Sequence, residues 1–327
     1  MSHELTYLEA IREALFEEMR RDGKVFVLGE DVGAYGGAFG ATKGLYDEFG
    51  EYRCLDTPIS ESCIIGVSVG AALRGYRPVA EMQFGDFITC GFDQIVNQAA
   101  TLRYRYGGRA SCPLVVRAPV GGNVAGGLFH SQNPESWFVH RPGLKVVAPS
   151  TAWDAKGLLK AAIRDDNPVI YLEHKYLYRR AKGPVPEGDE IVPIGKAAIR
   201  REGRHATLVT YGAMVLPALA AADRMAGEGV ETEVIDLRSL SPWDKETVFR
   251  SLGKTNRVVV VHEAVKTLGM GAEISAAIME ERFDTLDAPV MRVTYPDAHC
   301  PFSAVLEHEN LPNSDKILDG IRKVAGY

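Results

Sequence analysis

A carboxylate at the start of a helix is the first side chain that could do chemistry. The run DTPISE (56–61) places Pro58 and Ser60 just before a helix and Glu61 in its first turn. An acidic side chain in the first turn interacts favourably with the helix dipole, and serine is a common N-cap residue. Helix capping is therefore one interpretation of this run. The small residues of 66–72 allow close packing, which predicts a fully buried helix whose carboxylate needs a partner. A buried carboxyl group with a raised pKa can also exchange a proton with a ring nitrogen, so both interpretations stay open.

Two further segments offer a ring and an imidazole. Phe84 to Phe87 (FGDF) follow the strand-like PVAEM, at the end of a strand where α/β sheets form ligand crevices. An aromatic side chain there either packs in the core or stacks on a flat heterocycle. The glycine-rich run 121–127 leads into His130, which is either a solvated loop histidine or a group that moves protons near neutral pH.

The elements that must position these residues alternate between β-rich and helical runs. The pattern Thr6-x-x-Glu9 predicts a capped amphipathic helix over residues 5–19. Alternation of this kind predicts a parallel α/β sheet with helices on both faces. The predicted strands are 25–28, 78–82, 114–117, 144–149, 168–172, 206–212, 232–237 and 257–263, and the other predicted helices are 61–74, 91–105, 152–164, 215–227, 244–251, 270–283 and 316–324.

One segment interrupts the alternation. Residues 179–193 (RRAKGPVPEGDEIVP) are rich in proline, glycine and charge and show no periodicity. We therefore predict a first domain over residues 1–180, a linker over 181–195 and a smaller α/β domain over 196–327.

Composition excludes several classes of partner. The 327 residues carry a net charge of -6 with scattered Lys and Arg, which argues against nucleic acid. No run of ~18 apolar residues occurs, so we expect no membrane association. Five cysteines without a C-x-x-C pair indicate a reducing compartment. We expect a bacterial cytoplasm, or a mitochondrial matrix or plastid if a transit peptide has been removed.

Seven strings taken in order resemble one enzyme family. They are LGEDVG (28–33), DTPISE (56–61), FDQIVNQAA (92–100), HSQNPE (130–135), PGLKVVAPS (142–150), DAKGLL (154–159) and EHKYLYR (173–179). Together they resemble the beta subunits of thiamine-diphosphate-dependent pyruvate and branched-chain 2-oxo acid dehydrogenases. The resemblance implies a transketolase-like pyrimidine-binding domain followed by a transketolase C-terminal-like domain.

The resemblance also implies roles for four residues. Glu61 matches the glutamate that hydrogen-bonds a ring nitrogen of the cofactor's aminopyrimidine, and Phe87 matches the ring that stacks on it. The carbonyl of Ile59 would accept a hydrogen bond from the exocyclic nitrogen. His130 matches the histidine that faces the substrate and the incoming lipoyl group.

The same resemblance implies two metal ions, K⁺ and Mg²⁺. Some of these beta subunits hold K⁺ through backbone oxygens, and the matching positions are Leu114, Ala162, Ile163, Asp165 and Asn167. Mg²⁺ and the diphosphate are held in the family by a Gly-Asp-Gly stretch, which does not occur in this sequence. The resemblance thus implies an alpha subunit that supplies the diphosphate side, in an α2β2 heterotetramer.

The predicted reaction is oxidative decarboxylation of pyruvate, with acyl transfer to the lipoyl group of an acyltransferase partner. The tail at 297–303 is similar to pyruvate or acetoin dehydrogenases, whereas 235–238 and 241–243 also suit branched-chain enzymes acting on 2-oxoisovalerate. Three alternatives stay open: a branched-chain or acetoin dehydrogenase beta subunit, a self-sufficient transketolase-like enzyme and a non-catalytic assembly module.

Overall fold

The computed structural model describes residues 2–327, which divide into two compact units. Unit 1 consists of Met1–Val120 with Trp137–Ile194, and unit 2 consists of Gly121–Ser136 with Gly195–Tyr327. The glycine-rich loop that carries His130 thus belongs to the unit built mainly from the C-terminal half of the chain. In the described residues no helix has the length and apolar character needed to cross a membrane.

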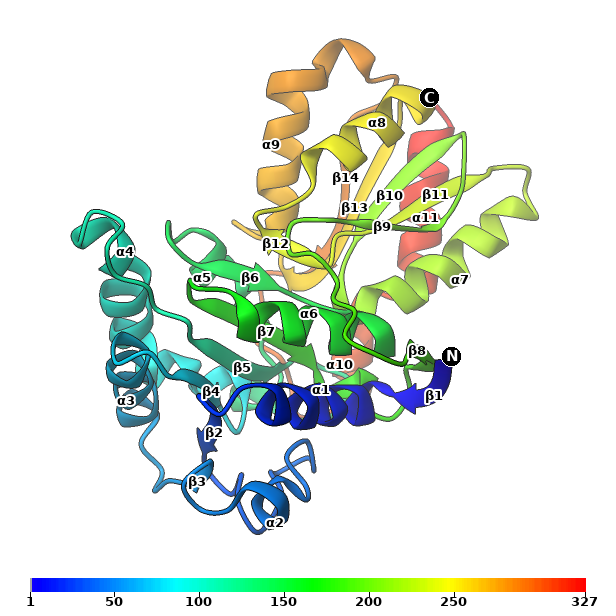
Figure 1. Cartoon of the computed structure of the whole chain (residues 1–327). Coiled ribbons are helices and arrows are strands. Elements are labelled where there is room, and N and C mark those ends of the chain that lie inside the picture. Colours follow the sequence, from blue (N-terminus) through cyan, green and yellow to red (C-terminus); the bar gives the residue numbers. More distant parts are fainter. Residues whose placement is uncertain (1) are drawn as a thin grey trace. The chain divides into compact units, whose positions relative to one another are not determined.

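Unit 1 is built on a parallel sheet (Figure 1). Its strands run in the order β6-β7-β5-β4-β2-β3. Their bounds are β2 Val25–Gly29, β3 Cys54–Asp56, β4 Arg77–Glu81, β5 Val115–Val120, β6 Lys145–Val147 and β7 Val169–His174. The strands β5 and β7 are buried along their whole length, as expected for a parallel sheet with both faces covered. The sequence predicted each of these strands except β3.

The strand order reverses beside β2. From β2 the chain moves to β3 on one side, and it then returns to β4 on the other side of β2. Such a reversal is a topological switch point, where the loops after neighbouring strands diverge and leave room for a ligand. The segments that follow β2, β3 and β4 therefore form the favoured binding edge of this sheet.

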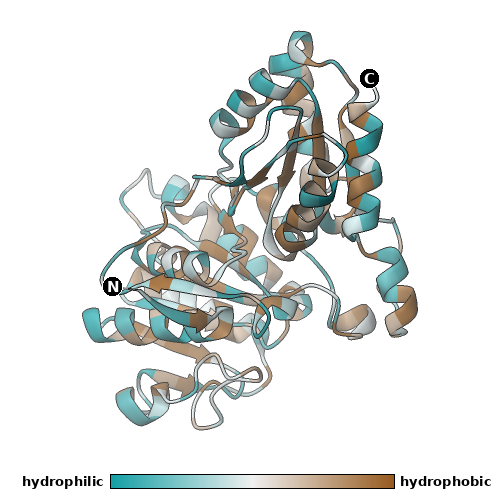
Figure 2. Ribbon diagram, turned by 90° about the vertical axis from the view of Figure 1, so that its right-hand side faces the viewer, coloured by the Kyte–Doolittle hydropathy of each residue, from teal (hydrophilic) through white to brown (hydrophobic). Residues whose placement is uncertain are grey.

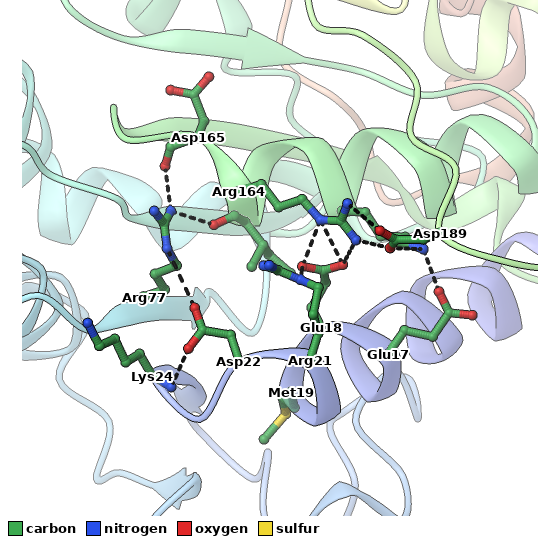
Figure 3. Close-up of polar contacts among 12 residues, drawn as sticks. Glu17, Glu18, Met19, Arg21, Asp22, Lys24, Arg77, Arg164, Asp165 and Asp189 are labelled. Atoms are coloured by element: carbon green, nitrogen blue, oxygen red, sulfur yellow. Dashed lines mark hydrogen bonds and ion pairs between the residues drawn. The ribbon is translucent and has the colours of Figure 1, made fainter.

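Two long helices of unit 1 pack together through apolar and charged contacts. α1 (Tyr7–Arg21) begins after Thr6, whose capping box with Glu9 is present as predicted. α6 (Ala152–Arg164) has its predicted bounds. Between them the buried Glu18 accepts hydrogen bonds from Arg164 at 2.5 Å and Arg21 at 2.8 Å (Figure 3). Because Glu18 is fully buried, this pairing satisfies a charge that would otherwise be costly.

The predicted linker begins as a strand. β8 (Lys182–Pro186) pairs antiparallel with β1 (Ser2–Thr6), which lies where the first helix was expected to start. The sequence did not predict either strand, because a run such as KGPVP lacks the alternation of a half-buried strand.

The segment 91–105 is helical throughout, as predicted, but its hydrogen-bond pattern changes along its length. It follows a 3-10 segment (Gly85–Gly91) and contains a π-helical turn (Gln94–Gln98), a second 3-10 turn (Ala99–Thr101) and α4 (Leu102–Arg105). A π turn inserts an extra residue into a helix and shifts the side chains that follow. Apolar periodicity alone cannot predict that insertion.

Unit 2 has its own five-stranded sheet in the order β14-β13-β10-β11-β9. β9 is antiparallel to β11, and the other pairs are parallel. The strands are β9 Ala198–Arg201, β10 Ala206–Thr210, β11 Thr232–Asp236, β13 Val258–Val265 and β14 Met291–Tyr295. The longer helices are α7 Val215–Ala226, α8 Lys245–Thr255, α9 Met270–Arg282 and α11 Ser314–Ala325, all near their predicted positions. Strands are mostly brown and outer helices largely teal in Figure 2, which fits apolar sheets with solvated helices.

The helix α3 (Glu61–Leu73, 13 residues) carries Glu61 at its start. Besides short 3-10 turns, the remaining elements are α2 Leu45–Phe49, α5 Glu135–Val139, β12 Ser239–Ser241 and α10 Ala304–Asn310.

Candidate active site

Glu61 is the first residue of α3, as the sequence predicted. Ser60 occupies the N-cap position, but its hydroxyl makes no capping hydrogen bond. The Glu61 side chain is half-buried. The prediction that the whole helix is buried is wrong for this chain by itself, because Cys63 and Val67 on one face are exposed.

A second carboxyl group lies beside Glu61. Glu30 follows β2 and is 7% exposed. Burial has the largest effect and raises the pKa of Glu30, and the charges of Glu61 and Asp31 raise it further. A hydrogen bond from the Ser60 backbone acts in the opposite direction. Glu30 therefore retains a proton more readily than an isolated glutamate.

Backbone contacts hold the ends of β2 and β3 together. The Gly33 amide donates to Asp56 Oδ1 at 2.6 Å, and the Thr57 amide donates to the Gly29 carbonyl at 2.9 Å. A Cβ atom on Gly33 would lie 2.5 Å from the Asp56 carboxylate, so only glycine allows this approach. These contacts fix the loops that carry Glu30 and Glu61.

Phe87 lies in the turn after β4 and is half-buried. It packs edge-to-face on Phe84 at 6.3 Å, and Phe84 packs in the same way on Phe39 at 5.3 Å. The turn passes close to β5, because a Cβ on Gly85 would lie 2.6 Å from Val120 Cγ1. An aromatic cluster therefore stands at the end of β4, next to the strand that leads to Glu30.

Ile59 lies between β3 and α3, and its side chain is 82% exposed. Its carbonyl oxygen accepts no hydrogen bond from the described residues. That oxygen is consequently free to accept one from a ligand.

His130 belongs to unit 2, whereas Glu61, Ile59 and Phe87 belong to unit 1. It follows a 3-10 turn, Gly127–Phe129, and is half-buried.

Models of known families cover almost the whole chain. Residues 3–181 match the transketolase pyrimidine-binding domain and residues 195–317 match the transketolase C-terminal domain. A split-gene transketolase, described as an inactive beta4 tetramer, has the same fold: its TM-score is 0.80 at 23% identity, and the match covers 98% of each chain.

Relatives narrow the family further. The chain is 49% identical over 324 residues to the 2-oxoisovalerate dehydrogenase subunit beta of Bacillus subtilis, with 99% of each chain covered. It is 46% identical, with the same coverage, to the pyruvate dehydrogenase E1 component subunit beta of that organism. The chain belongs to the beta subunits of the 2-oxo acid dehydrogenases. The predicted fold and family are thereby confirmed.

The binding edge of this beta subunit fits the aminopyrimidine half of thiamine diphosphate. Glu30 Oε1 and Thr57 Oγ1 are buried and have no hydrogen-bond partner among the described residues. Buried polar atoms without a partner are uncommon in folded proteins, and here they lie beside Glu61 at the switch point. A polar ring placed there would meet the Glu61 carboxylate and polar atoms that have no partner among the described residues.

The five positions matched to a potassium site lie in unit 1, and four of their carbonyl oxygens already accept hydrogen bonds. Leu114 O accepts from Val169 N at 2.9 Å, and Ala162 O accepts from Asp165 N at 3.2 Å. Arg77 Nη1 donates to Ile163 O at 3.0 Å and to Asp165 O at 3.1 Å.

Each carbonyl oxygen keeps a second lone pair, but the Arg77 guanidinium already donates to two of them, Ile163 O and Asp165 O. The Asp165 carboxylate pairs with Lys145 and accepts from Asn167 Nδ2 at 3.0 Å. Burial alone would raise the pKa of Asp165, but these hydrogen bonds outweigh it and lower that pKa. Figure 3 shows Arg77 reaching from Asp22 towards Asp165. Among residues 2–327, no group of three or more His, Cys, Asp or Glu side chains is arranged to hold a metal ion.

Sequence reasoning missed Glu30 and Phe39 as members of this edge, whereas Phe84 was named as part of FGDF. Glu30 lies in the string LGEDVG directly after a strand, and an acid at that point was the available signal. For Phe39 no local signal exists, because its contact with Phe84 depends on the path of the loop after β2.

Proposed function

We propose that this chain, together with an alpha subunit, catalyses the oxidative decarboxylation of pyruvate and passes the acyl group to the lipoyl group of an acyltransferase partner. The observation that carries this proposal is the position of Glu61. It begins a helix at the switch point of the sheet, beside buried Glu30, in a chain that matches 2-oxo acid dehydrogenase beta subunits over 99% of its length.

When bound, thiamine diphosphate supplies a carbon nucleophile and an electron sink for decarboxylation. Glu61 donates a hydrogen bond to the ring nitrogen of the aminopyrimidine and exchanges a proton with it. Glu30, whose pKa is raised, lies beside Glu61 and retains a proton more readily than an exposed glutamate. The Ile59 carbonyl accepts from the exocyclic nitrogen, while Phe87 packs on the ring and fixes its orientation.

His130 acts on the substrate side of the reaction. Its imidazole donates a proton to, or removes one from, the substrate or the incoming lipoyl sulfur. Histidine suits this task because its ordinary pKa lies near neutrality.

The alpha subunit completes the site. The sequence has no Gly-Asp-Gly stretch, and a hard divalent ion such as Mg²⁺ needs oxygen ligands beside the phosphates. We infer that the alpha subunit holds Mg²⁺ and the diphosphate in an α2β2 heterotetramer. The exposed face of α3, which includes Gly66 and Gly70, allows the close approach of another subunit.

A potassium ion bound by Leu114, Ala162, Ile163, Asp165 and Asn167 is a further part of the proposal. Thermal unfolding of the chain in KCl and in NaCl of equal ionic strength tests it. A higher Tm in KCl would support a structural K⁺, and equal Tm values in both salts would contradict it.

Substrate choice has two candidates. The tail at 297–303 supports pyruvate, while the relative at 49% identity is named for 2-oxoisovalerate. Assays of the assembled enzyme that follow the decarboxylation of pyruvate and of 2-oxoisovalerate, and the oxidation of acetoin, which has no carboxyl group to lose, rank the candidates by kcat/KM. Pyruvate should give the highest value. We also propose a bacterial cytoplasmic location, since both relatives come from Bacillus subtilis.

The direct test of the proposed function is Glu61→Ala. The variant should assemble with the alpha subunit and lose decarboxylation of every 2-oxo acid. Glu51→Gln, a change at an exposed acid, is the matched control and should retain full activity. Unchanged turnover in Glu61→Ala would refute the proposal and favour a non-catalytic assembly module.

A further inference from the structure

The loop that carries His130 is held by carboxylates far away in the sequence. Glu263 Oε1, at the end of β13, accepts a hydrogen bond from the Gly122 amide at 2.6 Å and another from Asn133 Nδ2 at 2.9 Å. Glu263 is 6% exposed. One carboxylate oxygen thus joins the two ends of the segment that contains His130.

A second buried carboxylate holds the middle of the same loop. Glu307 Oε2, on α10, accepts from the Ala125 amide at 3.0 Å, and the residue is 2% exposed. Gly122 lies between both acids, because a Cβ there would be 3.0 Å from Glu307 Oε1 and 3.4 Å from Glu263 Oε1. Carboxylates accept hydrogen bonds more strongly than neutral groups, which makes these anchors effective.

The loop backbone depends on such anchors. Asn123 and Ala125 have φ values of 63° and 53°, a region that residues other than glycine seldom adopt. Backbone of this kind persists only where the surroundings determine it. The Gly121 amide closes the loop on the Gln132 carbonyl at 3.0 Å, so that His130 lies inside a closed turn.

The first residue of α5, Glu135, is held in a similar way. Tyr211 donates its hydroxyl to Glu135 Oε1 at 2.6 Å, in a buried contact. Burial, and then the Glu135 carboxylate, raise the pKa of Tyr211, so the phenol keeps its proton and remains a donor. Elements of unit 2 therefore hold the loop before and after His130.

We propose that Glu263 and Glu307 are positioning residues that set the place of His130 through the loop backbone. The proposal rests on the role proposed above for His130. Both acids lie on regular elements, one on a strand and one on a helix, which hold a site more rigidly than loops do.

The test uses the α2β2 enzyme with Glu307→Ala, Glu307→Gln, His130→Ala and the double variant His130→Ala/Glu307→Ala. The rate of acyl transfer to a free lipoyl domain is measured for each. Displacement of a catalytic group by about 1 Å can cost on the order of 100-fold in rate, so Glu307→Ala should lose roughly 10- to 100-fold. Glu307→Gln keeps an acceptor oxygen and should recover part of that loss.

The double variant separates positioning from general destabilisation. If Glu307 acts through His130, the double variant should be no slower than His130→Ala. The control Glu309→Gln changes an exposed acid on the same helix and should leave the rate unchanged.

Hydrogen exchange supplies a readout without turnover. In the assembled enzyme without cofactor, Glu307→Ala should speed exchange of the Ala125 amide and its neighbours, and Glu309→Gln should not. Glu263→Gln tests the other anchor at Gly122 if Glu307→Ala does not fold.

The outcomes distinguish both proposals. Full activity in His130→Ala would refute the role of His130 itself. A large loss in His130→Ala together with wild-type rates and exchange in Glu307→Ala would overturn the positioning proposal, as would a double variant whose loss equals the product of the single losses.

Discussion

Arg117 on β5 is the side chain whose loss should destabilise unit 1 most. It is fully buried and pairs with two buried acids, Glu81 on β4 and Glu173 on β7. Its Nη2 lies 2.6 Å from Glu173 Oε1. In the Arg117→Met variant both carboxylates would remain in the core without their cation.

Breaking a buried ion pair costs about 3–5 kcal/mol, because it leaves an unpaired charge in the interior. In a unit of this size each kcal/mol lowers Tm by about 2–4 °C, so Tm should fall by roughly 6–20 °C. The loss should be larger at pH 8 than at pH 5, since a protonated Glu173 needs no cation. Burial raises the pKa of Glu173 to about 7 despite the opposing effect of Arg117.

Thermal unfolding followed by circular dichroism measures this effect. The matched comparison is the triple variant Arg117→Met, Glu81→Leu, Glu173→Leu, which replaces all three charges and should recover most of the lost stability. Arg103→Met, at an exposed arginine, is the surface control and should change Tm very little. A fall of less than about 2 °C in Arg117→Met, or a triple variant less stable than the single, would refute the reasoning.

Three further predictions concern Phe87, Glu61 and Glu173. Phe87→Ala should weaken thiamine diphosphate binding to the assembled enzyme roughly fivefold by calorimetry, because ring stacking contributes about 1 kcal/mol beyond buried area; unchanged affinity would contradict its role. Glu61→Gln should lower the pKa of Glu30, because burial and, second to it, the charge of Glu61 raise that pKa. A ¹³C NMR titration in which the pKa of Glu30 is the same in the variant and the wild type would argue against the pairing. Between pH 4.5, the ordinary pKa, and about pH 7, Glu173 keeps its proton in the folded state but not in the unfolded state. The free energy of unfolding should therefore fall as pH rises through this range. Glu173→Gln should reduce this dependence of the unfolding free energy on pH, which denaturant titrations at several pH values can check.

The elements that carry the site could be predicted from local patterns. α3 begins at Glu61, and α6 has its predicted bounds, because capping residues and apolar periodicity are local properties. The turn at Phe87 follows a strand, as FGDF suggested. Identification of the family needed no single motif, only several short strings in order.

What could not be predicted depends on long-range contacts. Glu263 and Glu307 hold a loop that lies 141 and 182 residues earlier in the chain, and no local pattern indicates that pairing. Glu30 approaches Glu61 only because β2 and β3 are neighbours in the sheet. The exposed face of α3 was expected to be buried, since small residues indicate close packing but not which chain provides the partner.

Calorimetric titration of thiamine diphosphate with Mg²⁺ is the most direct test of the central claim, which is that this chain provides only half of the site. The titration is made into the chain alone and into the chain co-expressed with its candidate alpha subunit. We predict tight binding of thiamine diphosphate in the mixture and none in the isolated chain. Tight binding by the isolated chain would contradict the split site and revive a self-sufficient transketolase-like enzyme.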